Sequence, residues 1–159
     1  ARIREIVLAA DDNGLDPRAE ALLMAADRAH HVATVVRPAL DAGRHVVTDR
    51  YLASSVAYQG EARGLGAEVV RDLSLWATHD LEPDLIVLLE VDPSEAWART
   101  GGARDRLEKA GEEFHRTVAR SYRRQADADP GRWAVVDGGG TVEEVAARVA
   151  EAVESRLAL

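Results

Sequence analysis

The chain contains 159 residues, 47% of them hydrophobic and 30% charged, which is the composition of one globular domain rather than of a disordered or fibrous protein. It has no cysteine, which excludes disulfides, thiolate metal sites and cysteine nucleophiles. A net charge of -8 disfavours nucleic-acid binding, and no apolar run approaches the roughly 20 residues of a membrane span. We therefore expect a cytoplasmic protein that binds neither nucleic acid nor a membrane.

The first residues have the pattern of the second half of a helix. The chain begins at Ala1 rather than at a methionine, and Ile3, Ile6 and Val7 follow at helical spacing up to a polar stretch at 11–14. We expect the sequence to start inside a helix, as a fragment of a longer protein does.

A long helix is predicted from about Arg18 towards Ala42. Pro17 lies near its start, where a missing N–H costs little, and Gly43 suits its end. Pro38 lies inside this helix, so we expect a kink or a break there.

Three short strands are predicted beyond this helix, at residues 45–49, 85–91 and 133–137, because these runs are apolar and rich in β-branched residues. Helices are expected between and after them: up to Tyr58 with a glycine loop from Gly60, then over 67–78, 93–99 and 105–126, and from Thr141, with Glu144 at the capping-box position. This alternation predicts an α/β fold with a parallel sheet flanked by helices, in a single domain over residues 1–159.

Two of the predicted strands end in a carboxylate, Asp49 and Asp137. Ligands of open parallel sheets bind beyond the carboxyl ends of the strands. Asp49 can hold Mg²⁺ or orient a hydroxyl there, and Arg50 can bind a phosphate with its fork of donors. A surface ion pair is the alternative interpretation.

A polar block follows at Ser54, Ser55, Tyr58 and Gln59, with helical spacing that gathers the hydroxyls and the phenol on one face. Such groups suit a sugar and a base edge, which need fixed donors and acceptors. The alternative is a polar helix start. On the preceding helix, Met24 and Arg28 are four residues apart and could hold a planar base. The alternative is that Met24 belongs to the core and Arg28 is a solvated surface residue.

Arginines gather around Gly101 and Gly102. A glycine-hinged loop of this kind can close over a polyphosphate, and we expect a lid around residues 99–108. A solvated charged loop is the alternative. The residues concerned are Arg99, Arg104, Asp105, Arg106 and Glu108.

These segments together resemble a known family. The order LLMAADRAHH, PALDAGRHVVTDRYLASSVAYQG, LEPDLIVLLEVDP and RDRLEKAGEEFHRTVARSY is similar to the bacterial thymidylate kinases over essentially all 159 residues. The resemblance implies a P-loop nucleoside-monophosphate-kinase-like fold. It also implies transfer of the γ-phosphoryl group of ATP to dTMP with Mg²⁺, giving dTDP, by a homodimer.

The resemblance also implies roles for individual residues. Asp49 would lie beside Mg²⁺, through water, and Arg50 would bind the dTMP phosphate. Arg28 would hydrogen-bond the thymine carbonyl edge, and Met24 stands where the family has a phenylalanine that stacks on thymine. The other implied roles are Ser55 and Gln59 near the base, Tyr58 under the deoxyribose, Arg99, Arg104 and Arg106 in the lid over ATP, and Asp105 and Glu108 steadying that lid.

The 159 residues contain no Walker motif, G-x-x-x-x-G-K-[ST]. The family carries this motif before the position that matches Ala1. We therefore expect the N-terminal strands to be absent from this chain and the chain alone to be inactive. Two alternatives stay open: a nucleotide-binding domain without catalysis, which an upstream sequence without the motif would favour, and a kinase for another nucleoside or nucleotide.

Overall fold

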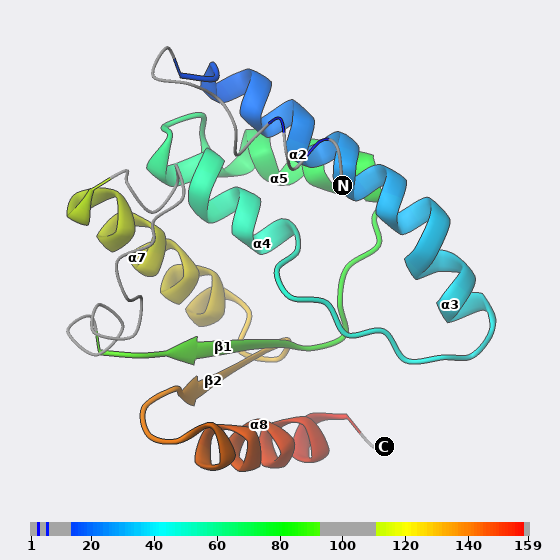
Figure 1. Ribbon diagram of the computed structural model, residues 1–159, viewed down its shortest axis with the longest axis vertical. Coiled ribbons are helices and arrows are strands. Elements are labelled where there is room, and N and C mark those ends of the chain that lie inside the picture. Colours follow the sequence, from blue (N-terminus) through cyan, green and yellow to red (C-terminus); the bar gives the residue numbers. More distant parts are fainter. Residues whose placement is uncertain (1–2, 4–5, 7–13, 93–110, 158–159) are drawn as a thin grey trace. The chain divides into compact units, whose positions relative to one another are not determined.

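The structure, a computed structural model, describes residues 3, 6, 14–92 and 111–157. The chain divides into two compact units, one formed by residues 1–82 and 105–122 and the other by residues 83–104 and 123–159. Among the described residues the first unit is helical and the second contains the strands (Figure 1). No helix in these ranges is both long and apolar enough to cross a membrane.

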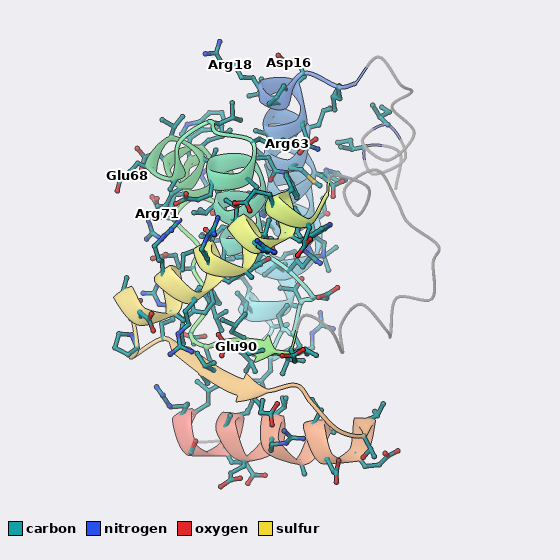
Figure 2. All side chains as sticks on the ribbon, turned by 90° about the vertical axis from the view of Figure 1, so that its left-hand side faces the viewer. Asp16, Arg18, Arg63, Glu68, Arg71 and Glu90 are labelled. Atoms are coloured by element: carbon teal, nitrogen blue, oxygen red, sulfur yellow. The ribbon has the colours of Figure 1, made fainter. Side chains whose placement is uncertain are left out.

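Helix α2 (Pro17–His31) begins at a side-chain cap, close to the predicted start. The Asp16 carboxylate accepts hydrogen bonds from the backbone N–H groups of Arg18, at 2.9 Å, and Ala19, at 3.2 Å. Figure 2 shows Asp16 and Arg18 at this end of the helix. Pro17 takes the first helical position, where no hydrogen bond is lost.

Helix α2 does not end at His31 but continues in a wider, π-helical form. A π-helical segment, η1 (Val32–Val36), leads directly into α3 (Arg37–Asp41). The Arg37 N–H bonds to the carbonyl of Val32, five residues back rather than four. Pro38 has no N–H, and its ring would clash with a carbonyl in a regular helix. The helix is therefore not broken at Pro38: a wider turn directly before the proline accommodates it, and the helix continues to Asp41.

Residues 44–50 do not form the strand that the sequence predicts at 45–49, so this prediction is wrong. Gly43 ends the helix as expected, with φ at +69°, and the chain then runs on without regular structure. The side chain of Val47 is 98% exposed. A strand needs a neighbour for its hydrogen bonds, and the sheet of the described residues contains only β1 and β2. Asp49 consequently follows an exposed segment and not a strand.

Helix α4 (Leu52–Ser55) continues into a second π-helical segment, η2 (Val56–Ala62). The combined helix is buried on almost every side, which places it in the interior of the first unit. The sequence predicts a loop from Gly60; the loop is present before α5, but its predicted start is wrong because the helical turns run on to Ala62. The buried residues are Leu52, Ala53, Ser55, Val56, Ala57, Gln59 and Gly60.

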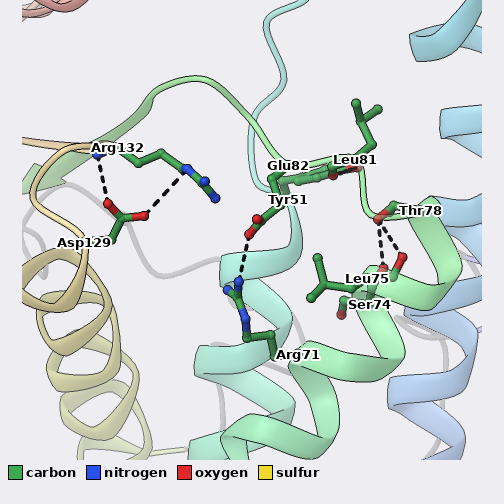
Figure 3. Close-up of polar contacts among 9 residues, drawn as sticks. All are labelled: Tyr51, Arg71, Ser74, Leu75, Thr78, Leu81, Glu82, Asp129 and Arg132. Atoms are coloured by element: carbon green, nitrogen blue, oxygen red, sulfur yellow. Dashed lines mark hydrogen bonds and ion pairs between the residues drawn. The ribbon is translucent and has the colours of Figure 1, made fainter.

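Helix α5 (Ala67–Thr78) has the predicted bounds and packs against η2 and α2 (Figure 1). A Cβ on Gly60 would lie only 3.0 Å from the Cα of Ala67, so a glycine permits this close approach. Arg71 of α5 pairs with Glu82 at 2.9 Å, and the Thr78 hydroxyl donates to the backbone carbonyls of Ser74 and Leu75. Figure 3 shows both sets of contacts. Trp76 on this helix is 79% exposed.

The second unit contains a parallel strand pair, β1 (Ile86–Glu90) and β2 (Trp133–Asp137). Ile86 lies opposite Trp133, and Glu90 lies opposite Asp137. Trp133 is only 6% exposed. Both strands were predicted, and the parallel sheet confirms the expected α/β class, with Asp137 at a carboxyl end.

Helix α8 (Val142–Arg156) packs against β2 (Figure 1). Its start has the predicted capping box: the Thr141 hydroxyl accepts from the Glu144 N–H at 3.2 Å, and the Glu144 carboxylate accepts from the Thr141 N–H at 2.8 Å.

Helix α7 (Glu112–Ala128) confirms the later part of the helix predicted over 105–126 and extends two residues beyond it. The two compact units divide it after Tyr122. The helix predicted over 93–99 and most of the one predicted before residue 11 lie outside the described residues.

Candidate active site

Arg28, in the last turns of α2, contacts the segment that follows Arg50. Its Nη2 donates to the Tyr51 carbonyl at 3.2 Å and to the Ser55 hydroxyl at 3.0 Å. Its guanidinium also lies over the Tyr51 ring, 5.6 Å from the centroid. Two of the predicted site residues, 27 positions apart, are therefore in direct contact.

The two terminal nitrogens of Arg28 differ in their contacts. Nη1 is buried and has no hydrogen-bond partner among the described residues. Burial lowers the pKa of the guanidinium, although Tyr51 and Asp27 oppose this effect. An arginine nonetheless stays charged, and a buried cationic donor without an acceptor is costly. A carbonyl oxygen from a bound molecule would satisfy it.

Arg50 has an unusual backbone conformation and lies on a tyrosine. Its φ is +64°, in the left-handed region, and its guanidinium carbon lies 5.1 Å from the centre of the Tyr58 ring. Partial burial lowers the pKa of Arg50, but the hydrogen bond with the Tyr58 hydroxyl and the electrostatic interactions with Tyr58, Tyr122 and Asp49 raise it by more. The net result is a pKa above the ordinary value, so this residue is a permanent cation.

Ser54 contacts a residue that sequence reasoning missed. Its hydroxyl shares a hydrogen bond of 2.6 Å with the hydroxyl of Tyr122 on α7. Burial raises the pKa of Tyr122, with Ser54 and Arg50 acting against it. The helical period could have found this residue, because Tyr122 follows Phe114 and Val118 at four-residue spacing on one face.

Gln59 is directed towards a buried acid, Glu20 of α2. The side-chain amide donates to a Glu20 carboxylate oxygen at 2.8 Å, and both residues are buried. Sequence reasoning missed Glu20 as well. An acid in the first turn of a helix usually complements the helix dipole at the surface, so its position gives no signal of burial.

Met24 lies one turn before Arg28 on α2 and is half-buried. Residues four apart share a helix face, so Met24 lies on the side of α2 that carries Arg28. Tyr58 is also half-buried, with its ring against Phe114 at a centroid distance of 5.9 Å and an angle of 66°.

Asp49 has the chemistry expected for an indirect magnesium ligand. Its carboxylate is exposed and directly precedes Arg50. No group of three or more His, Asp or Glu residues that could enclose a metal ion occurs in 14–92 or 111–157. Magnesium rarely needs such a group, because it keeps several waters and binds one or two carboxylates together with substrate phosphates. Asp49 therefore fits this ion. The predicted lid residues Arg99, Arg104, Asp105, Arg106 and Glu108 lie outside the described residues.

The sequence matches one protein family throughout most of its length. A family model described as thymidylate kinase matches residues 1–149. The thymidylate kinase of Leifsonia xyli is 55% identical over 160 residues, covering 99% of this chain and 75% of that protein. The thymidylate kinases of Clavibacter michiganensis and Bifidobacterium longum are 52% and 46% identical, covering 98% and 92% of this chain and 75% and 73% of theirs.

Proposed function

Because the chain belongs to the thymidylate kinase family, we propose that it transfers the γ-phosphoryl group of ATP to dTMP, giving dTDP. The main support for an acceptor site here is Nη1 of Arg28, which is buried and has no hydrogen-bond partner among the described residues. A carbonyl oxygen of a ligand would supply that partner. Neither alternative, a binding domain without catalysis or a kinase for another nucleotide, is favoured by a finding.

The base of dTMP is proposed to bind between α2 and the start of α4. Arg28 donates to a thymine carbonyl, and its hydrogen bond to Ser55 fixes the guanidinium in the required direction. Met24 covers one face of the ring from the same side of α2. Gln59 completes this end of the site, and Tyr58 lies under the deoxyribose.

The phosphate of dTMP is proposed to bind Arg50. The Tyr58 ring supports the guanidinium from one side, which leaves its donors for the phosphate oxygens. Asp49, directly before it, holds Mg²⁺ through water. When bound, this ion neutralises negative charge on the phosphate oxygens.

The lid is proposed to consist of Arg99, Arg104 and Arg106, with Asp105 and Glu108 supporting it. These cations would hold the polyphosphate of ATP. The chemistry of this chain is then positioning and charge stabilisation, because phosphoryl transfer needs no covalent intermediate with the protein.

The assembled state and compartment are part of the proposal too. The protein is proposed to be a cytoplasmic homodimer of single-domain subunits. The dimer alone is supported by apolar side chains at the surface of two helices of the first unit: Leu22 on α2, and Val69 and Trp76 on α5. Sedimentation analysis of the full-length protein tests the dimer, and a monomer at micromolar concentration would contradict it.

A coupled assay of ADP release by the full-length protein tests the activity. We expect turnover with dTMP and ATP that requires Mg²⁺, and far weaker turnover with dCMP, dAMP or dGMP. Absence of turnover with every deoxynucleoside monophosphate would show that the proposed function is wrong.

A further inference from the structure

A fully buried carboxylate lies next to the proposed acceptor site. The side chain of Glu20 is 0% exposed. It accepts hydrogen bonds from Gln59 at 2.8 Å and from Nε and Nη2 of Arg63 at 3.5 and 3.4 Å. A buried charge is tolerated only when partners compensate it. Glu20 therefore constrains Gln59 of the π-helical segment η2 and Arg63, the residue directly after it.

The charge of Glu20 determines how the Gln59 amide is turned. A carboxylate can accept hydrogen bonds but cannot donate them, so Gln59 must present its NH₂ group to Glu20. The amide oxygen then occupies the other branch of the side chain. A neutral amide at position 20 could accept or donate, and it would remove this preference.

Arg63 extends the effect of Glu20 to α7. Its guanidinium carbon lies 4.9 Å from the centre of the Phe114 ring, in the first turn of that helix. Phe114 contacts the Tyr58 ring edge-to-face, and the guanidinium of Arg50 lies over the Tyr58 ring. The contacts thus run without interruption from Glu20 to the arginine proposed to bind phosphate, and all of these residues belong to the first compact unit.

We propose that Glu20 is a positioning residue for the acceptor substrate: it orients the Gln59 amide and holds Arg63 on Phe114, and this stacked set supports the Tyr58 ring beneath Arg50. The inference rests on the proposed function, because Tyr58, Gln59 and Arg50 matter to dTMP only if that site binds it.

The same unit offers a matched control. Arg71 and Glu82 form another arginine–glutamate pair, at 2.9 Å, between α5 and the chain that follows it. This pair is partly exposed, with 47% of the Arg71 side chain and 26% of the Glu82 side chain accessible to solvent. Loss of its charge should leave nucleotide binding unchanged.

The experiment uses the full-length protein and calorimetric titration with dTMP and, separately, with ATP. Glu20→Gln should raise the Kd for dTMP at least fivefold and leave the Kd for ATP within twofold of the wild-type value. Arg63→Lys keeps a cation for Glu20 but removes the planar group that stacks on Phe114, so it should raise the dTMP Kd at least threefold. Glu82→Gln should change neither constant.

Three results would overturn the inference: wild-type dTMP affinity in Glu20→Gln, equal weakening of dTMP and ATP, or unchanged dTMP affinity in Arg63→Lys. If Glu20→Gln does not fold, the double variant Glu20→Gln, Arg63→Met decides the matter, because it leaves no unpaired buried charge. Its dTMP Kd should be raised at least fivefold, and a wild-type value would contradict the proposal. Wild-type protein that does not bind dTMP would instead refute the proposed function.

Discussion

Arg50 combines a strained backbone with a supported side chain. A non-glycine residue in the left-handed region is disfavoured by about 1–2 kcal/mol, and such strain persists where the surrounding structure imposes it. Here the guanidinium rests on Tyr58, which fixes the direction of its donors. The strained backbone therefore occurs at Arg50, the residue that we propose binds the dTMP phosphate.

Arg50→Ala should lower kcat/KM for dTMP at least 100-fold, because a fully engaged phosphate contact is worth about 3 kcal/mol in the transition state. Steady-state kinetics of the full-length enzyme measure this. Arg71→Ala, which removes an arginine from the surface pair with Glu82, serves as the control and should change kcat/KM less than twofold. A loss below threefold in Arg50→Ala would show that Arg50 does not bind the phosphate.

Met24→Phe should tighten dTMP binding roughly 2- to 12-fold, because aromatic stacking adds about 0.5–1.5 kcal/mol beyond the buried area. Titration calorimetry of both proteins decides it. Leu22→Phe introduces the same ring at an exposed position of α2 and should leave the affinity unchanged. Equal affinities for wild type and Met24→Phe would indicate that residue 24 does not cover the base.

Site residues could be predicted from the sequence where the pattern that identifies them lies within a short segment. Arg28 and Ser55 are predicted as site residues from the pattern of their own segments together with the family resemblance, and the structure brings them into contact. Glu20 and Tyr122 were missed because their partners lie 39 and 68 positions away in the sequence. A single sequence carries no local pattern for such pairs, which depend on how the helices pack.

The close packing of the π-helical segment η2 on α5 depends on a glycine. A Cβ at residue 60 would lie 3.0 Å from the Ala67 Cα and 3.3 Å from the Gly66 carbonyl oxygen, both of them backbone atoms that cannot move independently. Helix α5 would have to shift away from η2, which carries Tyr58 and Gln59.

Gly60→Ala should lower the free energy of unfolding by about 1–3 kcal/mol, the usual cost of overpacking, and weaken dTMP binding as η2 moves. Denaturant titration measures the first effect. Gly131→Ala is the matched control, because its nearest contact would be an ordinary 3.6 Å from a side-chain oxygen. If Gly60→Ala and the wild type have equal free energies of unfolding, α5 can shift away from η2 without loss of stability, and the prediction is wrong.

Helices with clear stops and the two strands that pair with each other were predictable, as the bounds of α5 and β2 show. The strand expected at 45–49 was not, because β-propensity reflects packing on a sheet, and this run has no neighbouring strand among the described residues. The π-helical turns were also missed, since their extra residue leaves no mark in composition.

The prediction of a single domain leads to a calorimetric test. We expect the full-length protein to unfold in one transition, with equal calorimetric and van't Hoff enthalpies. Helix α7 supports this, because its residues are shared between both compact units and a helix forms cooperatively along its length. Two resolved transitions would contradict the single domain.

The contrast between two tryptophans gives each compact unit a different optical signal. Trp133 on β2 is almost completely shielded from solvent, whereas Trp76 on α5 is largely in contact with it. Indole fluorescence shifts to longer wavelength when the ring becomes hydrated, so the emission of Trp133 is sensitive to opening of the strand pair and that of Trp76 hardly changes. The sequence has a third tryptophan, Trp97. The double variant Trp76→Phe, Trp97→Phe would emit from Trp133 alone and would report on the β1–β2 unit without any attached dye.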